Sequence, residues 1–332
     1  MPLISHPNQK NALGDIKHRA VRDLAWCCFS APMMKELPGS EAFIFPFEQP
    51  NTWRWLYELD QNPQKLLQHL ESLKSTRLGI YYEALWHFYF ENHPEWELLQ
   101  HNLQIDRKGI TLGAFDFLCR HGNDYWHIET AVKFYLFNPN ESAQGHGWNS
   151  WIGPSALDRL DLKLNHLRNH QLPLHQTAEG KAALDAFYPQ VSRWNTGLCL
   201  QGYLFSPQHQ QAQPEFSHPQ HGRGRWFFAR EMLQELINLN ERRWTVLERK
   251  QWLAPALTDD VSNVLTNAQL AEKIGESIAA SRPLLVATMK ADEQVDTSMP
   301  DIWREESRVF IVPDNWPGQS VRPGTATPSR NT

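Results

Sequence analysis

Apolar and polar residues alternate through residues 111–136, which predicts two β-strands joined by a tight turn. The turn falls at residues 121–124, where Gly, Asn and Asp supply the backbone freedom that hairpin turns need. On the first strand, one face carries Asp116 together with Leu112, Ala114 and Leu118. On the second strand, one face carries His127, Glu129, Ala131, Lys133 and Tyr135. Charged side chains are therefore expected on strands that otherwise have the composition of a core.

Helical spacing of apolar residues predicts the elements that flank this strand pair. A helix over residues 76–92 carries Glu83, and a strand follows over residues 96–105. A second helix is expected over residues 155–170. Its N-cap and apolar stripe comprise Ser155, Leu157, Leu160, Leu164 and Leu167. A last strand over residues 197–205 completes the order helix, three-stranded meander, helix, strand.

Changes in pattern and composition divide the chain into four parts. Residues 1–75 are expected to form an N-terminal helical scaffold, and residues 76–206 an α/β core. Residues 207–312 are expected to form a C-terminal α+β extension. Residues 313–332 are rich in Pro, Gly, Ser and Thr, which predicts a disordered tail. The expected fold class is therefore α/β, with additions on both sides of the core.

Asp116, Glu129 and Lys133 form a candidate metal site for phosphodiester chemistry. Magnesium binds hard oxygen ligands, usually one or two carboxylates together with waters and phosphate oxygens. A nearby ammonium can orient the attacking water or stabilise developing charge. The competing interpretation is an ion pair between Glu129 and Lys133 on a solvated sheet face. The apolar residues of both strands favour a central position, where unpaired charge is uncommon unless it has a function.

The order of elements over residues 76–205 resembles the PD-(D/E)XK nuclease superfamily, whose core runs helix, three-stranded meander, helix, strand. The stretches LGIYYEALWHF, GAFDFL, HIETAVKFYL and WIGPSALDRLDLKL also resemble a bacterial family catalogued only as a domain of unknown function and grouped with these nucleases. The resemblance implies a restriction-endonuclease-like core. It also implies hydrolysis of DNA or RNA with Mg²⁺ or Mn²⁺ as the cofactor.

The same resemblance implies roles for individual residues. Asp116 corresponds to the metal-binding aspartate of the superfamily, and Glu129 to the acidic residue of its third strand. Glu83 corresponds to a glutamate that many members carry on the first helix, where it supports a bound water. Gln171 corresponds to a glutamine that some members place after the second helix. The implied metal ligands are Asp116, Glu129 and Glu83, with the Thr130 carbonyl as a further ligand.

The position of the lysine departs from the superfamily pattern. The family lysine lies two residues after the strand acid, and Ala131 stands at that position here. Lys133 lies on the same face two residues further on, about 6.6 Å along the strand. Three interpretations remain open: Lys133 orients the attacking water, Lys163 on the second helix does so, or the site is catalytically inactive. In the last case the chain is a nuclease-fold module that binds nucleic acid or a protein partner.

Residues 217–230 form a second candidate surface. Arg223 and Arg225 lie beside Trp226, a composition typical of contact with nucleic acid through phosphates and stacked bases. The competing interpretation is that these are ordinary surface arginines. Arg223, Arg225 and Trp226 are therefore candidates for nucleic-acid contact.

Charge and cysteine content limit the expected partners of the protein and its expected cellular compartment. The 332-residue chain has a formal net charge of −5, so any surface for nucleic acid must be local. Its four cysteines form neither a disulfide framework nor a CxxC metal motif, which is typical of a reducing cytoplasm. The sequence shows no signal-peptide core and no membrane-spanning apolar run. We therefore expect a cytoplasmic protein without membrane association.

Overall fold

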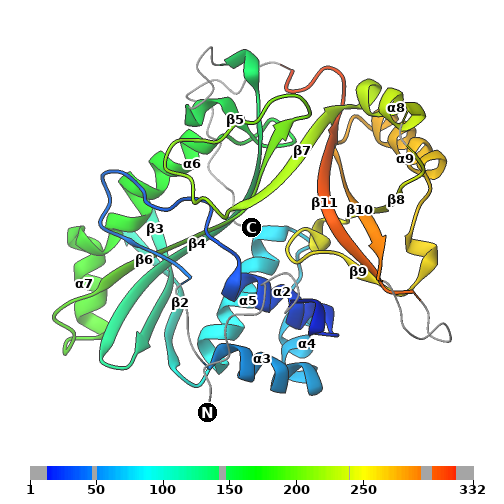
Figure 1. Ribbon diagram of the computed structural model, residues 1–332. Coiled ribbons are helices and arrows are strands. Elements are labelled where there is room, and N and C mark those ends of the chain that lie inside the picture. The colour runs from blue at the N-terminus through cyan, green and yellow to red at the C-terminus, as the bar shows by residue number, and fades with distance from the viewer. Residues whose placement is uncertain (1–12, 47–50, 142–146, 239, 293–300, 319–332) are drawn as a thin grey trace.

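The computed structural model describes residues 13–46, 51–141, 147–238, 240–292 and 301–318. Within these residues, eleven strands form one mixed sheet with the main order β2-β3-β4-β6-β7-β11-β10-β8 (Figure 1). The strands are β1 (Phe43–Ile44), β2 (Trp96–Arg107), β3 (Ile110–His121), β4 (Asp124–Phe137), β5 (Trp151–Ile152), β6 (Asn195–Pro207), β7 (Gly222–Phe228), β8 (Arg243–Val246), β9 (Leu257–Thr258), β10 (Leu284–Ala291) and β11 (Trp303–Val312). The helices are α2 (Arg19–Phe29), α3 (Thr52–Gln61), α4 (Gln64–Glu71), α5 (Leu78–Asn92), α6 (Leu160–His166), α7 (Ala178–Phe187), α8 (Ala229–Asn238) and α9 (Asn267–Ala279).

Helix α5, which directly precedes β2, is apolar on most of its surface, and other elements cover it on several sides. Its buried residues are Tyr81, Tyr82, Ala84, Leu85, Trp86, Phe88, Tyr89 and Phe90. A helix that is apolar nearly all round must be buried in a core or a membrane. No helix in the described ranges is long and apolar enough to cross a membrane. Instead, α5 packs on β2 and β4, with α2 and α4 against it (Figure 1).

Strands β2, β3 and β4 form an antiparallel meander, and β6 lies parallel to β4. Helix α6 packs in a cluster separate from that of α5, in which Leu160, Leu164 and Leu167 are fully buried beside Tyr135 of β4. The elements expected over residues 76–205 therefore occur in the expected order. The whole chain is a mixed α/β protein with a large mixed sheet.

The second helix differs from its expected form. Residues 153–158 make a tight turn in which Ala156 has a φ of 55°, so α6 begins only at Leu160. Leu157, expected in the apolar stripe, is 86 % exposed. After α6 the chain continues as a π-helix over Leu167–Gln171. The single helix expected from spacing is therefore wrong, because apolar spacing does not show where backbone hydrogen bonding stops or changes.

The C-terminal part of the chain continues the same sheet. Strand β7 lies parallel to β6 on one side and to β11 on the other, and β10 and β8 extend the sheet further. Helices α8 and α9 pack on this part through a shared apolar cluster. Residues 222–228, expected as part of a surface segment, are thus a strand inside the sheet. The boundary expected after residue 206 falls within β6.

Part of the expected disordered tail is packed against the sheet. Trp316 is 7 % exposed, and its ring centroid lies 5.0 Å from that of Trp226 on β7. The expectation of disorder is therefore wrong for residues 313–318, since Trp316 buries its ring in the core. The remainder of the expected tail, residues 319–332, lies outside the described residues.

Candidate active site

Asp116 and Glu129, called here the acid pair, lie where strands β3 and β4 separate. The regular pairing of these strands ends at Phe117 and Ile128, next to the two acids. Beyond that point, side chains replace the backbone ladder. The amide of Thr130 donates to Oδ2 of Asp116 at 2.9 Å, and the amide of Asp116 lies 3.5 Å from Oε1 of Glu129. The two carboxylates therefore meet at the opening between the strands.

A break in strand alternation accompanies this opening. Phe117 packs in the cluster that contains α5, whereas Phe115 and Leu118 share the cluster that contains α7. Residues three apart on a regular strand would face opposite sides of the sheet. On the neighbouring strand β2, Asn102 has a φ of 54°, which regular strands do not adopt. The unbroken alternation expected through Asp116 is therefore wrong.

Glu129 is fully buried, and both of its carboxylate oxygens have hydrogen-bond partners. Nε2 of His127 lies 2.7 Å from Oε1, and Nε2 of Gln171 donates to Oε2 at 2.5 Å. Oε1 of Gln171 in turn accepts a hydrogen bond from Nζ of Lys163 at 2.9 Å. The structure thus joins Lys163 of α6 to the acid pair through one glutamine.

The π-helix over Leu167–Gln171 brings Gln171 next to Lys163. A π-helix bonds residue i to i+5, so each turn holds about one residue more than an α-helical turn. One α turn and one π turn together span about eight residues, which is the separation of Lys163 and Gln171. A continuous α-helix would instead place His170 above Lys163. Helical spacing alone therefore identifies the wrong residue as the neighbour of Lys163.

Burial sets the charge balance of the site. It raises the pKa of Asp116, and the nearby carboxylate of Glu129 raises that pKa further. Burial also raises the pKa of Glu129 to about 8, although the charge of Lys163 opposes the rise. Burial lowers the pKa of Lys163, and the charge of Lys133 lowers it further. Nearby positive charge therefore neutralises the two close carboxyl groups only in part, an arrangement that favours a bound cation.

Lys133 and Glu83 lie near the acid pair but form hydrogen bonds elsewhere. Nζ of Lys133 donates to Oδ2 of Asp158 at 2.5 Å. The alternative of a solvated ion pair with Glu129 is therefore wrong, since Glu129 is buried. Nε2 of His101 lies 2.8 Å from Oε1 of Glu83. Burial is the main cause of the raised pKa values of the acid pair, and the charge of Glu83 adds to it.

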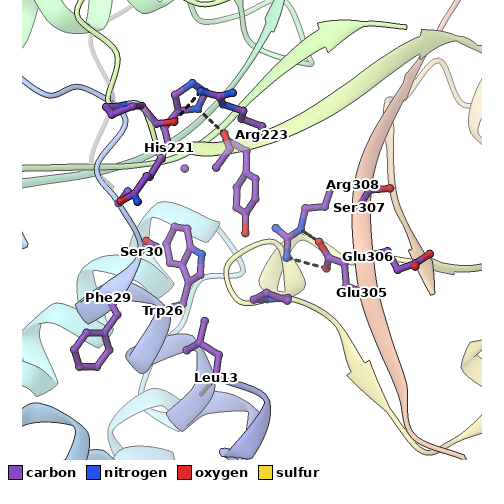
Figure 2. A pocket seen from close by; sticks show the side chains of 17 residues that line it. Leu13, Trp26, Phe29, Ser30, His221, Arg223, Glu305, Glu306, Ser307 and Arg308 are labelled. Carbon is purple, nitrogen blue, oxygen red and sulfur yellow. Dashed lines mark hydrogen bonds and ion pairs between the residues drawn. The ribbon is translucent and has the colours of Figure 1, made fainter. Parts of the chain in front are cut away.

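The arginines and the tryptophan of β7 do not form a joint stacking surface. Trp226 is 4 % exposed, and its Nε1 donates to the carbonyl of Phe137. The expectation that Trp226 stacks on a base is therefore wrong. Nη1 of Arg225 donates to the carbonyl of Pro207, whereas Arg223 is exposed beside a cavity of about 420 Å³ (Figure 2).

The buried charge in this cavity is already paired. Arg308 donates to Oε1 of Glu305 at 2.6 Å (Figure 2). It also donates to the carbonyl of Ala254 at 2.6 Å. Its guanidinium also lies 4.3 Å from the ring centroid of Tyr203. Because these partners satisfy Arg308 within the protein, we place the candidate site at the acid pair rather than in this cavity.

The acid pair fits a divalent cation that keeps water or substrate ligands. Mg²⁺ commonly uses only one or two carboxylates and completes its shell with waters and phosphate oxygens. Oδ1 of Asp116 accepts no hydrogen bond from the described residues, which leaves it available. Those residues contain no cluster of three or more His, Cys, Asp or Glu side chains placed to hold a metal. Glu83, expected as a third ligand, is thus held by His101 outside the acid pair.

We expect the contribution of Glu129 to the stability of the metal-free protein to fall as the pH rises from about 4.5 to about 8. Burial raises the pKa of Glu129 from its ordinary 4.5 to about 8 in the folded state. Between these values Glu129 binds more protons in the folded state than in the unfolded chain, so its contribution to the free energy of unfolding falls with rising pH. Burial lowers the pKa of His87, His93, His127 and His221 to about 4, and these histidines act in the opposite direction below about pH 6.5. At about 1.4 kcal/mol for each pKa unit, the loss is on the order of a few kcal/mol. Urea unfolding in the presence of a chelator, at a series of pH values, measures it.

The Glu129→Gln protein is the control for this measurement. Its amide does not ionise, so the unfolding free energy of the variant should rise relative to that of the wild type as the pH increases over this range. An equal change in both proteins would assign the pH dependence to groups other than Glu129.

A family model described as "Domain of unknown function (DUF1853)" matches residues 22–312, which include every residue of the candidate site. A search of curated proteins and a search of solved structures each found no match. The description of the matching family assigns no substrate or activity. The chemistry must therefore be inferred from the geometry of the site.

Proposed function

The chain belongs to the family described as Domain of unknown function (DUF1853), and we propose that it is a metal-dependent nuclease that hydrolyses phosphodiester bonds of DNA or RNA. One observation carries the proposal. Asp116 and Glu129 converge at the opening between β3 and β4, and Lys163 reaches Glu129 through Gln171. Carboxylates that can hold a metal, with an ammonium beside them, are the groups that metal-assisted hydrolysis of a phosphodiester needs.

The order and pairing of the elements support the proposal. Helix α5, the β2–β3–β4 meander, α6 and the parallel strand β6 occur in the order of the PD-(D/E)XK superfamily that the sequence resembles, with β5 before α6 and α7 after it. The acid pair lies on the second and third strands of that series, where the superfamily carries its metal-binding acids. The proposal therefore combines this resemblance with the geometry of the site.

Asp116 and Glu129 would hold Mg²⁺ or Mn²⁺. When bound, such an ion neutralises charge on the phosphate and lowers the pKa of a coordinated water. The protein orients the two ligands: the amide of Thr130 holds Oδ2 of Asp116, and Gln171 holds Oε2 of Glu129. Glu83 lies outside the pair and adds negative charge that can support a water in the site.

We assign the lysine role to Lys163 rather than to Lys133. Burial lowers the pKa of Lys163, and the charge of Lys133 lowers it further, so Lys163 releases a proton more readily than an exposed lysine does. Its position beside Gln171 lets it orient an attacking water and stabilise charge that develops on the phosphate. Lys133 is held by Asp158 and influences the site through its charge.

A second function is favoured by one observation. Ala131 fills the position at which the superfamily carries its lysine, and this alanine is buried in the cluster beneath α6. If Lys163 does not replace the missing lysine, the chain is a module that binds nucleic acid or a protein partner without cleaving a bond.

Isothermal titration calorimetry with Mg²⁺ and Mn²⁺ tests the metal site directly. The wild-type protein should bind the ion, and the Asp116→Ala, Glu129→Ala double variant should not. Glu97→Ala is a matched control, because Glu97 is an exposed strand glutamate paired with Arg120. It should bind the ion as the wild type does. The wild-type protein should then cleave single-stranded DNA, double-stranded DNA or single-stranded RNA when Mg²⁺ is supplied.

The outcomes separate the two functions. Metal binding that depends on the acid pair, without cleavage of any of these nucleic acids, would favour the binding module. If the wild-type protein binds no metal even with nucleic acid present to complete the coordination shell, the acid pair has a structural role. The nuclease proposal is then rejected.

A further inference from the structure

We propose that His127 is a positioning residue that fixes the orientation in which Glu129 meets a metal ion, an inference that rests on the nuclease function proposed above. Nε2 of His127 lies 2.7 Å from Oε1 of Glu129. Both side chains are fully buried, so bulk water cannot take over this contact. His127 itself touches neither metal nor substrate in this proposal, and it acts only through Glu129.

The pairing of β4 explains why His127 can hold Glu129. The two residues are two apart on a strand, so their side chains leave the same face. His127 pairs with Leu118 of β3 and with Thr196 of β6, so strands flank it on both sides. Glu129 pairs with Leu198 of β6, but it lies beyond the last pair between β3 and β4. His127, which is paired with strands on both sides, thus supports Glu129, which faces the opening between β3 and β4.

Packing fixes the ring of His127. The ring of Phe115 meets it edge-on, with 4.6 Å between centroids, and the ring of His175 lies 5.8 Å away. A buried ring in a close-packed cluster keeps one rotamer, since another would overlap its neighbours. Nε2 of His127 therefore stays directed at Glu129.

When Glu129 is ionised, as metal binding requires, the hydrogen-bond partners assign the proton of the neutral His127 ring to Nε2. Nδ1 of His127 has no partner among the described residues, whereas Nε2 faces a carboxylate oxygen. The opposite tautomer would set a nitrogen lone pair against that oxygen. His127 thus donates to Oε1 of Glu129 while Gln171 donates to Oε2. Glu129 is held at both oxygens, and lone pairs remain for a metal.

Because Glu129 is held at both oxygens, we predict that loss of one of these hydrogen bonds lowers the affinities for different metal ions by different amounts. Mg²⁺ requires nearly ideal octahedral geometry and short bonds, whereas Ca²⁺ accepts longer bonds and variable geometry. Loss of a hydrogen bond to a metal-binding side chain typically weakens metal binding about 10- to 100-fold. A Glu129 carboxylate that has lost the contact with His127 should therefore lose more affinity for Mg²⁺ than for Ca²⁺.

Two substitutions of similar polarity test the contact. In His127→Gln the amide nitrogen can take the place of Nε2, whereas in His127→Asn it lies where Nδ1 was and cannot reach Glu129. By calorimetry, we expect His127→Asn to bind Mg²⁺ about 10- to 100-fold more weakly than the wild type. We expect His127→Gln to bind close to the wild type, and Ca²⁺ affinity to change less than Mg²⁺ affinity in His127→Asn.

Equal Mg²⁺ affinities of the two variants would overturn the inference, because ring packing rather than the donor would then matter. Glu129→Ala separates this failure from failure of the proposed function. If Glu129→Ala abolishes Mg²⁺ binding while both His127 variants bind as the wild type does, the inference falls and the metal site stands. If the wild-type protein binds no metal, both fall.

A measurement on the wild-type protein decides the matter if either variant fails to fold. Nitrogen-15 NMR of the imidazole rings distinguishes the two neutral tautomers. With Mg²⁺ bound, which requires an ionised Glu129, we expect His127 to carry its proton on Nε2. We also expect its resonance to differ from that of the metal-free protein. A proton on Nδ1 in the presence of Mg²⁺, or a resonance that Mg²⁺ leaves unchanged, would overturn the inference.

Discussion

Replacing Asp116 with alanine is expected to lower the rate of Mg²⁺-dependent phosphodiester cleavage by a factor on the order of 10³, the equivalent of several kcal/mol of transition-state stabilisation. The amide of Thr130 holds one oxygen of Asp116, and the described residues leave the other without a donor. Asp116 thus offers a metal ion an oxygen whose position is set by the backbone. Initial cleavage rates of labelled oligonucleotides over a range of Mg²⁺ concentrations measure the loss.

Two control variants make this result specific. Asp116→Asn keeps the shape of the side chain and an acceptor for the Thr130 amide but removes the charge, so it should lose activity to a similar extent. Its free energy of unfolding should not fall, because the repulsion between Asp116 and Glu129 is gone. Glu97→Ala should cleave as the wild type does. Unchanged cleavage in both Asp116 variants would contradict the assignment.

The Lys163→Met protein is expected to lose cleavage by about 10²- to 10⁴-fold, the usual contribution of a side chain that transfers or orients a proton. Lys133→Met should lose much less, because Lys133 is held by Asp158 and not by the acid pair. Methionine keeps most of the aliphatic length of lysine and removes only the charged group. Measurement of kcat and KM for both variants, with the same oligonucleotides, compares the two lysines directly.

Metal binding gives this comparison a second readout. Burial raises the pKa of Glu129, and the charge of Lys163 opposes this rise. Lys163 is not itself a ligand in the proposed metal site. Lys163→Met should therefore retain Mg²⁺ binding while losing kcat. If Lys133→Met loses cleavage and Lys163→Met does not, the lysine role belongs to Lys133, and substrate binding must release it from Asp158.

Local periodicity was sufficient to identify several elements and the faces of their residues. The alternation along β4 places His127, Glu129 and Lys133 on one face, because strand geometry sets the direction of each side chain locally. The spacing of α5 identifies a helix for the same reason. Leu157 shows the limit of this reasoning, because it satisfies the helical period but lies in an exposed turn. Periodicity records which residues are apolar, not whether backbone hydrogen bonds continue between them.

The candidate site could be predicted only in part. The acid pair follows from charged residues on otherwise apolar strands, but the choice between Lys133 and Lys163 does not. Lys133 is closer to Glu129 along the chain, yet Lys163 is the lysine that the structure joins to Glu129 through Gln171. The alternation of β4 already places His127 on the same face as Glu129. The role of His127 in holding Glu129 depends on the burial of both side chains, which the pattern of a single strand does not reveal.

By itself, the sequence determined strands β2, β3, β4 and β6, most of their faces and the acidic residues that they carry, because these follow from steric preferences between neighbours along the chain. Only the tertiary structure decided where β3 and β4 separate, how the π-helix over Leu167–Gln171 directs Gln171 to the acid pair, and that β7 continues the sheet. Each of these depends on contacts between segments far apart in the chain, which override local propensity and leave no periodic signal in the sequence.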